Sequence, residues 1–600
     1  MTKKYILLFV FFVLPFLFFG RAFAQTDNFK TTADISYSVA ADGLTTVSHK
    51  ITIENLTTKF YVDSFSLKVA GTQPLNPRAS ENATPIILLT KMQGDSWSLD
   101  LELEKIVGLG KTRSFEILFE TASFAEKTGS VWEILIPGEE GNNVYDVTSV
   151  TLYTSSEFGS PAYISPLPTR RFQKDEKFAF EFRSKDIPLN GLSAAFGDFQ
   201  IFDFYLAYHL ENPLSRESKF QIAVPPDTAF QKVIYQAFDP KPTNLEADQD
   251  GNWLADFSLA AQQKLDVNVS GVVEIYSQPI FQNNLDEDDF KPFLAPSAVW
   301  QTDDPKIVEI ARKLKTPKAI YDYVSKNLTY DYSRVRPNVD RLGASRVLQE
   351  PNRSICTEYT DLFIAIARAA GIPAREVNGY AYSQNPNIEP LSLVADVLHA
   401  WPEYWDKDLL VWRPVDPTWA STSGGTDYFT KLDLRHFAFV MHGTDYQKPY
   451  PPGSYKLGEN PQKDVYVTLS DQSISRSVSV EINILSLRNL PWRDSQMEIS
   501  IENTGNTAIY DRDLQILFDG KIVDFKKVPA LLPFSKTTKL VDVPFSFFGN
   551  RTPETLTVAF GEDEKTILTY KSSLIIFSLL SSAVAIFIAC GFVVWLIKAK

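Results

Sequence analysis

Short runs of alternating apolar and polar residues, broken by Gly, Asn and Asp turns, fill three long stretches of the chain. The first stretch begins with Ile35, Tyr37 and Val39. A period of two is typical of half-buried strands, and many short runs of this kind favour antiparallel sandwiches. No catalytic pattern appears in these stretches, so they suggest spacers or binding modules. We therefore expect three β-sandwich domains, the last of them Ig-like, over residues 25–162, 163–290 and 460–569.

Between residues 291 and 450 the pattern changes to helical spacing. Asp304 followed by Pro305 is a typical helix start, and apolar residues then recur every three or four positions. Thr316-Pro317 predicts another helix start. A further helix is predicted to begin near Cys356, because the apolar residues that follow fall on one stripe and Gly371 suits its end. The fold class we predict is therefore multidomain: β-sandwich modules flank an α+β core, and one C-terminal transmembrane helix follows.

The first 24 residues have the features of a secretory signal peptide. Two lysines precede an apolar stretch over residues 6–19, and Ala22-Phe23-Ala24 provides a small-residue cleavage pattern. We expect residues 1–24 to be a signal peptide that is removed; an uncleaved anchor is the alternative.

Near the other end, residues 574–597 carry no charge, and a single membrane span needs about 20 residues. Lys598 and Lys600 follow, and basic residues prefer the cytoplasmic side. We expect a transmembrane helix over residues 572–597, with a buried soluble helix as the alternative. The prediction is a single-pass membrane protein with a short cytoplasmic C-terminus, whose bulk is extracytoplasmic, at the cell surface or in the periplasm.

The composition narrows the function further. Apolar residues make up 44% and charged residues 22%, which is typical of folded domains, and the net charge of −14 argues against nucleic acid as a partner. With two cysteines, a disulfide framework is excluded, and no zinc-binding spacing is present. Cys590 falls in the predicted span, so Cys356 is the sole thiol of the exported region. A lone cysteine there is either a buried core residue or a reactive group.

The setting of Cys356 favours a reactive thiol. A helix N-terminus stabilises thiolate through its unsatisfied N–H groups. Ser354 is the candidate capping residue of this helix. Glu358 and Asp361 lie in its first turns, where their charges would partly oppose a lowered thiol pKa. A cysteine at a helix start without chemistry is the alternative.

A thiolate nucleophile needs a proton carrier, and His399 is the best candidate. It opens an aromatic strand that a short turn connects to a second strand. If Trp405 pairs with Leu409, this hairpin brings His399 opposite Val415 and beside Asp416. A carboxylate in that place orients the imidazole and stabilises the imidazolium. The other histidines have simpler explanations: strand positions for two of them (His49 and His209) and the surface for the others (His436 and His442).

These residues also carry a family resemblance. The stretch resembles the transglutaminase-like domain of the papain-type thiol enzyme superfamily in three patterns over about 150 residues of the chain. The patterns are Cys356-Thr-Glu-Tyr with Arg368-Ala-Ala-Gly-Ile-Pro-Ala-Arg375, His399-Ala-Trp with Glu403 and Trp405, and Val415-Asp416-Pro-Thr-Trp419. The family more often has Gly near the cysteine, where this chain has Ser354-Ile355.

The resemblance implies Cys356 as nucleophile, His399 as general acid and base, and Asp416 as the residue that orients it. It implies attack on an amide carbonyl of a protein or peptide and a thioester intermediate, followed by crosslinking, deamidation or proteolysis. The backbone N–H of Cys356 is a natural oxyanion donor, and Tyr330 is a candidate second donor that could equally be a core residue.

Two other function classes are alternatives to this enzyme. One is a non-catalytic cell-surface binding or adhesion protein that uses the central domain as a scaffold. The other is a metal hydrolase, which is disfavoured because His436 and His442 have no convincing carboxylate or histidine at helical spacing. We expect no cofactor and no metal.

Overall fold

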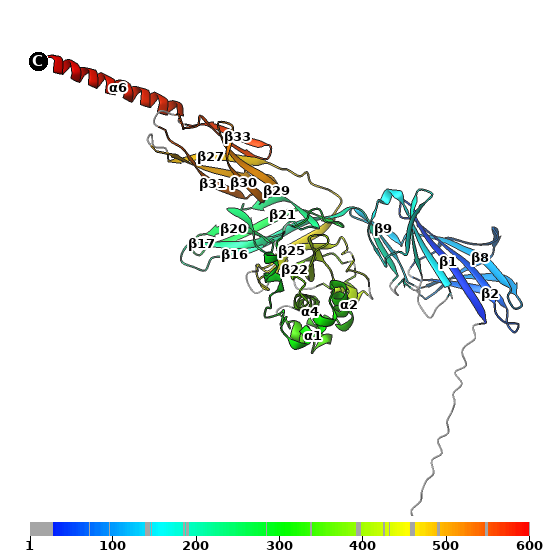
Figure 1. The fold of residues 1–600 in the computed structure, drawn as a ribbon. Helices are drawn as coiled ribbons and strands as arrows, with labels where there is room; N and C mark the ends of the chain where they lie inside the picture. The colour runs from blue at the N-terminus through cyan, green and yellow to red at the C-terminus, as the bar shows by residue number, and fades with distance from the viewer. Residues whose placement is uncertain are drawn as a thin grey trace, which may run out of the picture.

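The structure is a computed structural model of the chain. It describes residues 28–598 apart from residues 71, 95, 139–144, 146, 184–185, 188–190, 284, 337–338, 384, 392–395, 397, 424–425, 431, 457–461, 489–492, 547–549 and 570. The predicted signal peptide over residues 1–24 lies outside the described residues. The described chain is mostly β-sheet, with a central α+β region and one long C-terminal helix (Figure 1).

Residues 29–196 form a first β unit. Its strands are β1 (Phe29–Val39), β2 (Thr45–Asn55), β3 (Val62–Ala70), β4 (Leu75–Glu81), β5 (Thr84–Ile86), β6 (Leu88–Gln93), β7 (Ser96–Ile106), β8 (Thr112–Thr121), β9 (Ala125–Thr128), β10 (Val131–Ile136), β11 (Val147–Ser155), β12 (Pro161–Ser165), β13 (Arg170–Lys174), β14 (Lys177–Arg183) and β15 (Leu192–Phe196). They form an eight-stranded sheet and two smaller ones, in the orders β13-β14-β11-β1-β2-β8-β4-β5, β12-β15-β10-β9 and β3-β7-β6.

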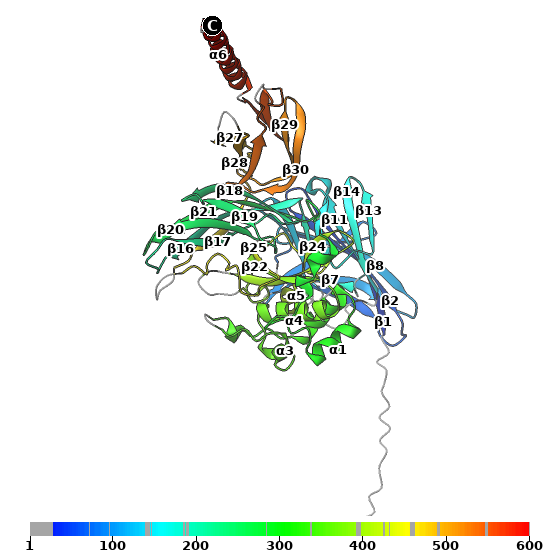
Figure 2. The same cartoon turned by 60° about the vertical axis from the view of Figure 1, so that its left-hand side comes forward.

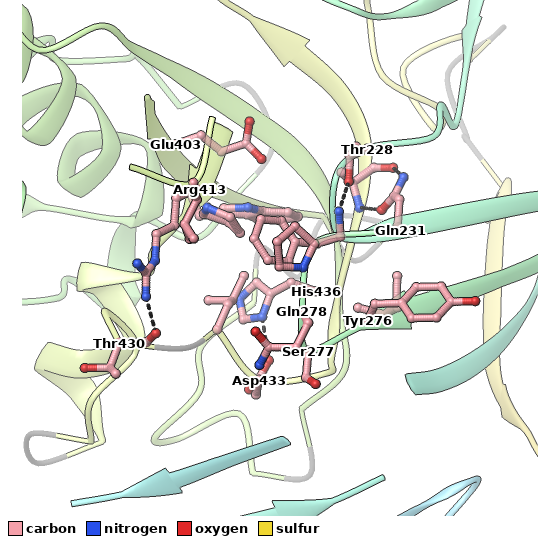
Figure 3. A pocket seen from close by; sticks show the side chains of 18 residues that line it. Thr228, Gln231, Tyr276, Ser277, Gln278, Glu403, Arg413, Thr430, Asp433 and His436 are labelled. Carbon is pink, nitrogen blue, oxygen red and sulfur yellow. Dashed lines mark hydrogen bonds and ion pairs between the residues drawn. The ribbon is translucent and has the colours of Figure 1, made fainter. Parts of the chain in front are cut away.

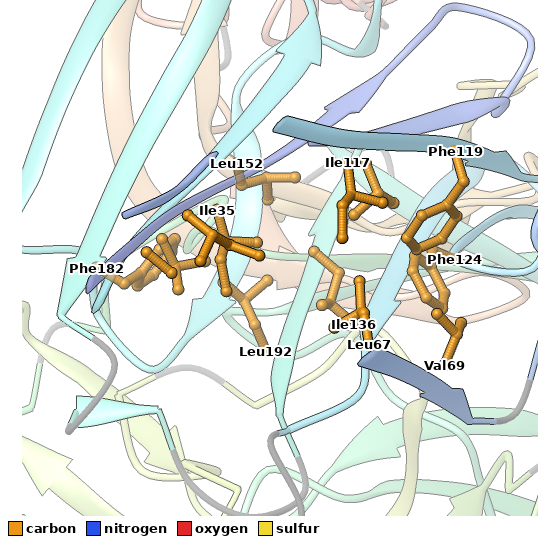
Figure 4. Packing of buried hydrophobic residues seen from close by; sticks show 14 of the residues in the cluster. Ile35, Leu67, Val69, Ile117, Phe119, Phe124, Ile136, Leu152, Phe182 and Leu192 are labelled. Carbon is orange, nitrogen blue, oxygen red and sulfur yellow. The ribbon is translucent and has the colours of Figure 1, made fainter. Parts of the chain in front are cut away.

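One apolar core joins the three sheets of this unit. Ile117 from the large sheet, Leu192 from the second and Leu67 from the third belong to the same cluster of buried side chains (Figure 4). Burial alternates along β8, as the period of two predicts. The expected domain boundary between residues 162 and 163 falls inside this unit, because β11 and β14, from its two sides, pair with each other.

A second β unit follows and is interrupted by the central region. Its strands are β16 (Phe199–Glu211), β17 (Ser218–Val224), β18 (Gln231–Asp239), β19 (Asn244–Ala247), β20 (Trp253–Leu259), β21 (Lys264–Tyr276) and β26 (Val465–Ser470). They form sheets of order β18-β21-β16-β26 and β17-β20-β19. Val465 pairs with Leu206, so β26 is the edge strand of a sheet whose other strands precede the central region. Residues 465–470, which were expected in the third sandwich, therefore belong to this unit.

The central region places helices against a four-stranded sheet. Its elements are α1 (Pro305–Lys313), α2 (Pro317–Asn327), α3 (Ala344–Val347), α4 (Cys356–Ala369), α5 (Pro417–Thr422), β22 (Ala374–Ala381), β23 (His399–Asp406), β24 (Val411–Pro414) and β25 (His436–His442). The sheet order is β24-β23-β22-β25, and α4 packs on β22 and β23. Phe437 of β25 contacts Phe204 of β16, with ring centroids 5.5 Å apart, so the second β unit also packs against this sheet.

The hairpin of β23 and β24 differs in register from the prediction. Trp405 pairs with Trp412 and not with Leu409, because residues 407–410 form the turn. β24 ends at Pro414, and the chain then turns directly into α5. Asp416 therefore reaches the site from the start of a helix and not from a strand.

The third β unit and the last helix complete the chain. The elements are β27 (Val480–Arg488), β28 (Ser495–Asn503), β29 (Ile509–Phe518), β30 (Lys521–Leu531), β31 (Lys536–Val543), β32 (Thr555–Phe560), β33 (Asp563–Leu568) and α6 (Lys571–Lys598). The strands form two sheets, β27-β28-β31 and β30-β29-β32-β33, around one core. α6 projects away from the rest of the molecule (Figures 1 and 2). Its segment Ile576–Lys598 is long and apolar enough to cross a membrane and is not buried.

Candidate active site

The first turn of α4 carries Cys356 at its first position. Ile355 is the residue that precedes the helix, and its backbone N–H donates to Glu358 Oε2 at 3.0 Å. Glu358 thus caps the helix, in the role that was expected of Ser354. The Ser354 hydroxyl instead donates to the Pro351 carbonyl oxygen at 3.1 Å. Cys356 is therefore held at a helix N-terminus whose first donors are partly satisfied by an acidic side chain.

The two carboxylates in the first turns of α4 are paired with arginines. Arg334 Nη1 lies 3.1 Å from Glu358 Oε2, and Arg341 Nη2 lies 2.5 Å from Asp361 Oδ1. The side chains of Glu358 and Asp361 are fully buried. Their negative charges, which the sequence suggested would oppose ionisation of the thiol, are thus balanced locally.

His399 and Asp416 meet although they belong to different elements. His399 is the first residue of β23, and Asp416 is the residue that caps α5. His399 Nε2 lies 2.9 Å from Asp416 Oδ2. Asp416 Oδ1 accepts hydrogen bonds from the backbone N–H groups of Thr418 at 2.8 Å and Trp419 at 3.0 Å. The helix start therefore fixes the carboxylate, and the carboxylate fixes the imidazole.

Aromatic side chains fix the plane of the His399 ring. Trp419 stacks on it at a centroid distance of 5.3 Å, and Trp401 stacks at 5.9 Å. Within the described chain, the second ring nitrogen, Nδ1, has no hydrogen-bond partner of standard geometry. Cys356 nevertheless interacts with this ring strongly enough to shift its pKa. The thiol therefore lies close to the imidazole.

A second histidine shares the same carboxylate oxygen. His436, the first residue of β25, places Nε2 3.3 Å from Asp416 Oδ2 and Nδ1 2.7 Å from Asp433 Oδ1. The prediction that His436 and His442 are surface residues was wrong, since both are buried. A signal was present in the sequence: residues 436–442 are apolar between the two histidines, which is typical of a strand buried on both faces.

Burial and charge act in opposite directions on these groups. Burial lowers the pKa of His399, but the Asp416 carboxylate outweighs it and raises that pKa to about 9. Burial likewise lowers the pKa of His436, and Asp433, with help from Asp416, raises it to about 9. Burial raises the pKa of Asp416, yet the two imidazoles, His399 foremost, hold it well below its usual value. The site is thus a carboxylate between two imidazolium-forming rings.

Tyr330 lies at the edge of the same site. Its backbone forms a bridge with Ser354, two residues before the cysteine. Burial raises the pKa of its hydroxyl, and the adjacent Cys356 side chain raises it further. The hydroxyl therefore stays protonated and can donate a hydrogen bond, which is a property required of an oxyanion donor.

The three predicted site residues are strongly buried. Cys356 is 4% exposed, His399 1% and Asp416 0%. A cavity of about 90 Å³ lies next to the site, between the second β unit and the central sheet, and His436 and Asp433 are in its wall together with Gln231 and Tyr276 (Figure 3). Cys356 and His399 do not line this cavity.

The His399, Asp416 and His436 side chains are also a set that could hold a metal ion. One ligand atom from each lies within 4.8 Å of the others. Both Nε2 atoms, however, point at the same carboxylate oxygen at hydrogen-bond distance, which is the arrangement of a hydrogen-bonded network. The prediction that His436 has no carboxylate nearby was wrong, since it contacts Asp433 and Asp416.

Known proteins resemble this region. A protein-glutamine gamma-glutamyltransferase of Pseudomonas aeruginosa strain PAO1 is 25% identical over 212 residues, which is 32% of this chain and 30% of that protein. The structure of a proposed cysteine protease from Cytophaga hutchinsonii matches at a TM-score of 0.31 and 19% identity, over 46% of this chain and 93% of the other. The periplasmic domain of TgpA from Pseudomonas aeruginosa matches at 0.23 and 18% identity, over 38% and 91%. Residues 306–417, which include Cys356, His399 and Asp416, match the family model of the transglutaminase-like superfamily, so the chain contains a transglutaminase-like domain.

Proposed function

We propose that this protein is an exported, membrane-tethered thiol enzyme that acts on amides of proteins or peptides. Cys356 is the nucleophile, His399 the general acid and base, and Asp416 the residue that orients His399. α6 is the membrane anchor, and the bulk of the chain is extracytoplasmic. The β units, which we take to be sandwiches with an Ig-like third member, hold the central domain away from the bilayer.

The reaction begins with proton transfer from Cys356 to His399 and attack of the sulfur on the amide carbonyl carbon. The tetrahedral oxyanion accepts hydrogen bonds from the backbone N–H of Cys356 and from the Tyr330 hydroxyl. As the C–N bond breaks, His399 returns its proton to the leaving ammonia or amine, and a thioester remains. A lysine amine then gives a crosslink, and water gives deamidation or peptide cleavage.

The observation that carries this proposal is the 2.9 Å contact between His399 and Asp416 beside a cysteine at a helix start. The imidazole has one nitrogen engaged by the carboxylate and the other available to the sulfur. This division of roles is the one that nucleophilic catalysis by a thiol requires. The curated relative is named for transfer of the γ-glutamyl group of protein glutamine, which makes glutamine amides the first substrates to test.

The proposal is tested with the full chain in detergent micelles. A glutamine-containing peptide and a biotinylated primary amine are added, and amine incorporation, ammonia release and new peptide termini are measured together. We expect one of these products with the native chain and with Cys590→Ala, which keeps the candidate nucleophile. Cys356→Ala should abolish the product while the circular dichroism spectrum stays unchanged.

A scaffold without catalysis is the second candidate, and the burial of Cys356 and His399 is the observation that favours it. An acyl group has to reach the sulfur, and a thiol that is 4% exposed offers little surface to it. Thiol labelling separates the two candidates. Labelling of Cys356 by a glutamine-like electrophile at low concentration supports the enzyme, and labelling only after unfolding supports the scaffold.

A further inference from the structure

The third β unit has two distinct ends, and strand register identifies the end from which α6 leaves. Leu568, the last residue of β33, pairs with Thr555, the first residue of β32. Leu556 of β32 pairs in turn with Phe518, the last residue of β29. The turn between β29 and β30 therefore lies at the same end of the sheet as the start of α6, although it precedes that helix by about 50 residues.

Large apolar side chains are exposed at this end. Ile522 and Val523, just after the turn, are 56% and 50% exposed, and Phe525 further along β30 is 56% exposed. Leu568 is 76% exposed. β30 and β33 are the two edges of the four-stranded sheet, so exposed apolar residues lie on both edges of this end. We call these four residues the helix-end patch.

The opposite end of the unit is occupied by protein. The Asn506 carbonyl oxygen accepts a hydrogen bond from Tyr235 of the second β unit at 3.0 Å, and Lys232 contacts the Ala508 carbonyl oxygen at 3.5 Å. Val478, close to this end, is also exposed, at 61%. It therefore serves as a comparison residue: an exposed apolar side chain of the same unit at the end remote from α6.

Basic residues lie next to the helix-end patch. Lys521 and Lys526 are exposed on β30, on either side of Ile522 and Phe525. A lysine stem can lie along apolar surface while its ammonium group reaches a polar layer. Apolar residues interleaved with lysines are the composition of surfaces that rest in the headgroup region of a bilayer.

We propose that the helix-end patch contacts the lipid bilayer that α6 crosses, with the β29–β30 turn seated in the headgroup layer. This inference rests on the membrane anchoring in the proposed function. Two attachments, the helix and the turn, would fix the direction of the third unit relative to the membrane. Because that unit is hydrogen-bonded to the second, which packs on the catalytic sheet, the catalytic domain would be held at a defined orientation above the lipid.

The test uses the full chain reconstituted in liposomes of mixed neutral and anionic lipids. A nitroxide label is placed on the native Cys590 of α6 in Cys356→Ser, and on Val523→Cys or Val478→Cys in the background without native cysteines. The accessibility of each label to oxygen, which partitions into lipid, and to a water-soluble nickel chelate is measured by electron paramagnetic resonance. We expect a ratio of oxygen to nickel accessibility several-fold higher at residue 523 than at residue 478.

The label on Cys590 separates the inference from the anchoring on which it rests. If Cys590 is in lipid and residue 523 is as water-exposed as residue 478, the contact of the patch is refuted and the anchor stands. If Cys590 itself is water-exposed, the anchor fails and the patch proposal fails with it.

Discussion

Two of the buried charged clusters of the central domain differ in what balances their carboxylates. In the first, Arg341 Nη2 lies 2.5 Å from Asp361 and 2.6 Å from Glu376. In the second, Asp416 is shared by the imidazoles of His399 and His436. Both clusters remove charge from water, which is costly unless the charges are paired. Burial of charge alone therefore does not mark an active site.

The difference lies in the partner of the carboxylate. Burial lowers the pKa of Arg341, but Asp361 and Glu376 raise it well above its ordinary value, so this cation never gives up its proton. The imidazoles around Asp416 have a pKa near 9 and can exchange protons, and one of them is beside a thiol. We infer that the ion pairs of Arg341 stabilise α4 and do not take part in proton transfer. The Asp416 cluster is the one whose groups can exchange protons during a reaction.

We expect the largest loss of activity when the candidate nucleophile beside the Asp416 cluster is replaced. Cys356→Ala removes the only thiol near the Asp416 cluster, and we expect the reaction rate to fall by a factor on the order of 10⁶, to background. The free energy of unfolding should change little, because a small buried residue is replaced by another. Cys590→Ala is the matched control and should retain full activity. Residual product in Cys356→Ala would place the chemistry elsewhere.

The second largest effect is expected at Asp416. Asp416→Asn keeps an oxygen for the backbone N–H groups of Thr418 and Trp419, so helix capping should survive. It removes the charge that stabilises the His399 imidazolium, and we expect kcat/KM to fall by about 10⁴. Urea unfolding measures stability in parallel. Equal losses of activity and stability would indicate a structural carboxylate.

The Arg341 cluster should respond in the opposite way. Arg341→Met leaves two buried carboxylates without their cation, and we expect a loss of about 3–5 kcal/mol in the free energy of unfolding. Activity per folded molecule should be retained. Arg346→Met, in a solvent-exposed pair with Glu350, is the control and should cost about 1 kcal/mol or less. A loss of activity per folded molecule in Arg341→Met would contradict the inference that the Arg341 cluster has only a structural role.

A smaller effect is expected at His436. This ring competes with His399 for the Asp416 charge, so His436→Gln should strengthen the hold of Asp416 on His399 and raise the pKa of His399. We expect the alkaline limb of the pH–activity profile to move up by about 1 pH unit. An unshifted limb together with lower stability would make His436 a packing residue only.

The pH dependence of stability gives the smallest signal. The pKa of His399 is raised to about 9 in the folded chain, above the unfolded value of about 6.5. A group with a raised pKa stabilises the fold fully below the unfolded pKa and loses that contribution as pH rises through the folded one. We therefore expect thermal stability to decline between about pH 6.5 and 9. Asp416→Asn should flatten this decline.

The sequence was informative about single elements of the site. The helix start at Cys356 follows from local periodicity and the C-terminal helix from a long uncharged stretch, and the structure has both. The proximity of His399 and Asp416 was inferred through a hairpin register that the structure does not have. The inference reached the right pair because Asp416 lies just beyond the hairpin, where α5 begins.

Non-local pairing could not be predicted. β26 pairs with β16, which lies more than 250 residues earlier in the chain, and no local pattern specifies that partner. The place of His436 has the same origin, because it depends on β25 joining the edge of the sheet beside β22. Glu358 can cap the helix in place of Ser354 because Arg334, at the end of a short 3₁₀ helix earlier in the chain, neutralises the buried carboxylate.

The central claim is tested most directly by mass-spectrometric detection of the acyl-enzyme. The full chain is mixed briefly with a glutamine-containing peptide, quenched in acid and digested. The account predicts a thioester adduct on the fragment that holds Cys356, present in Cys590→Ala and accumulating when no amine is added. An adduct absent under all conditions, or unchanged in Cys356→Ala, would contradict it.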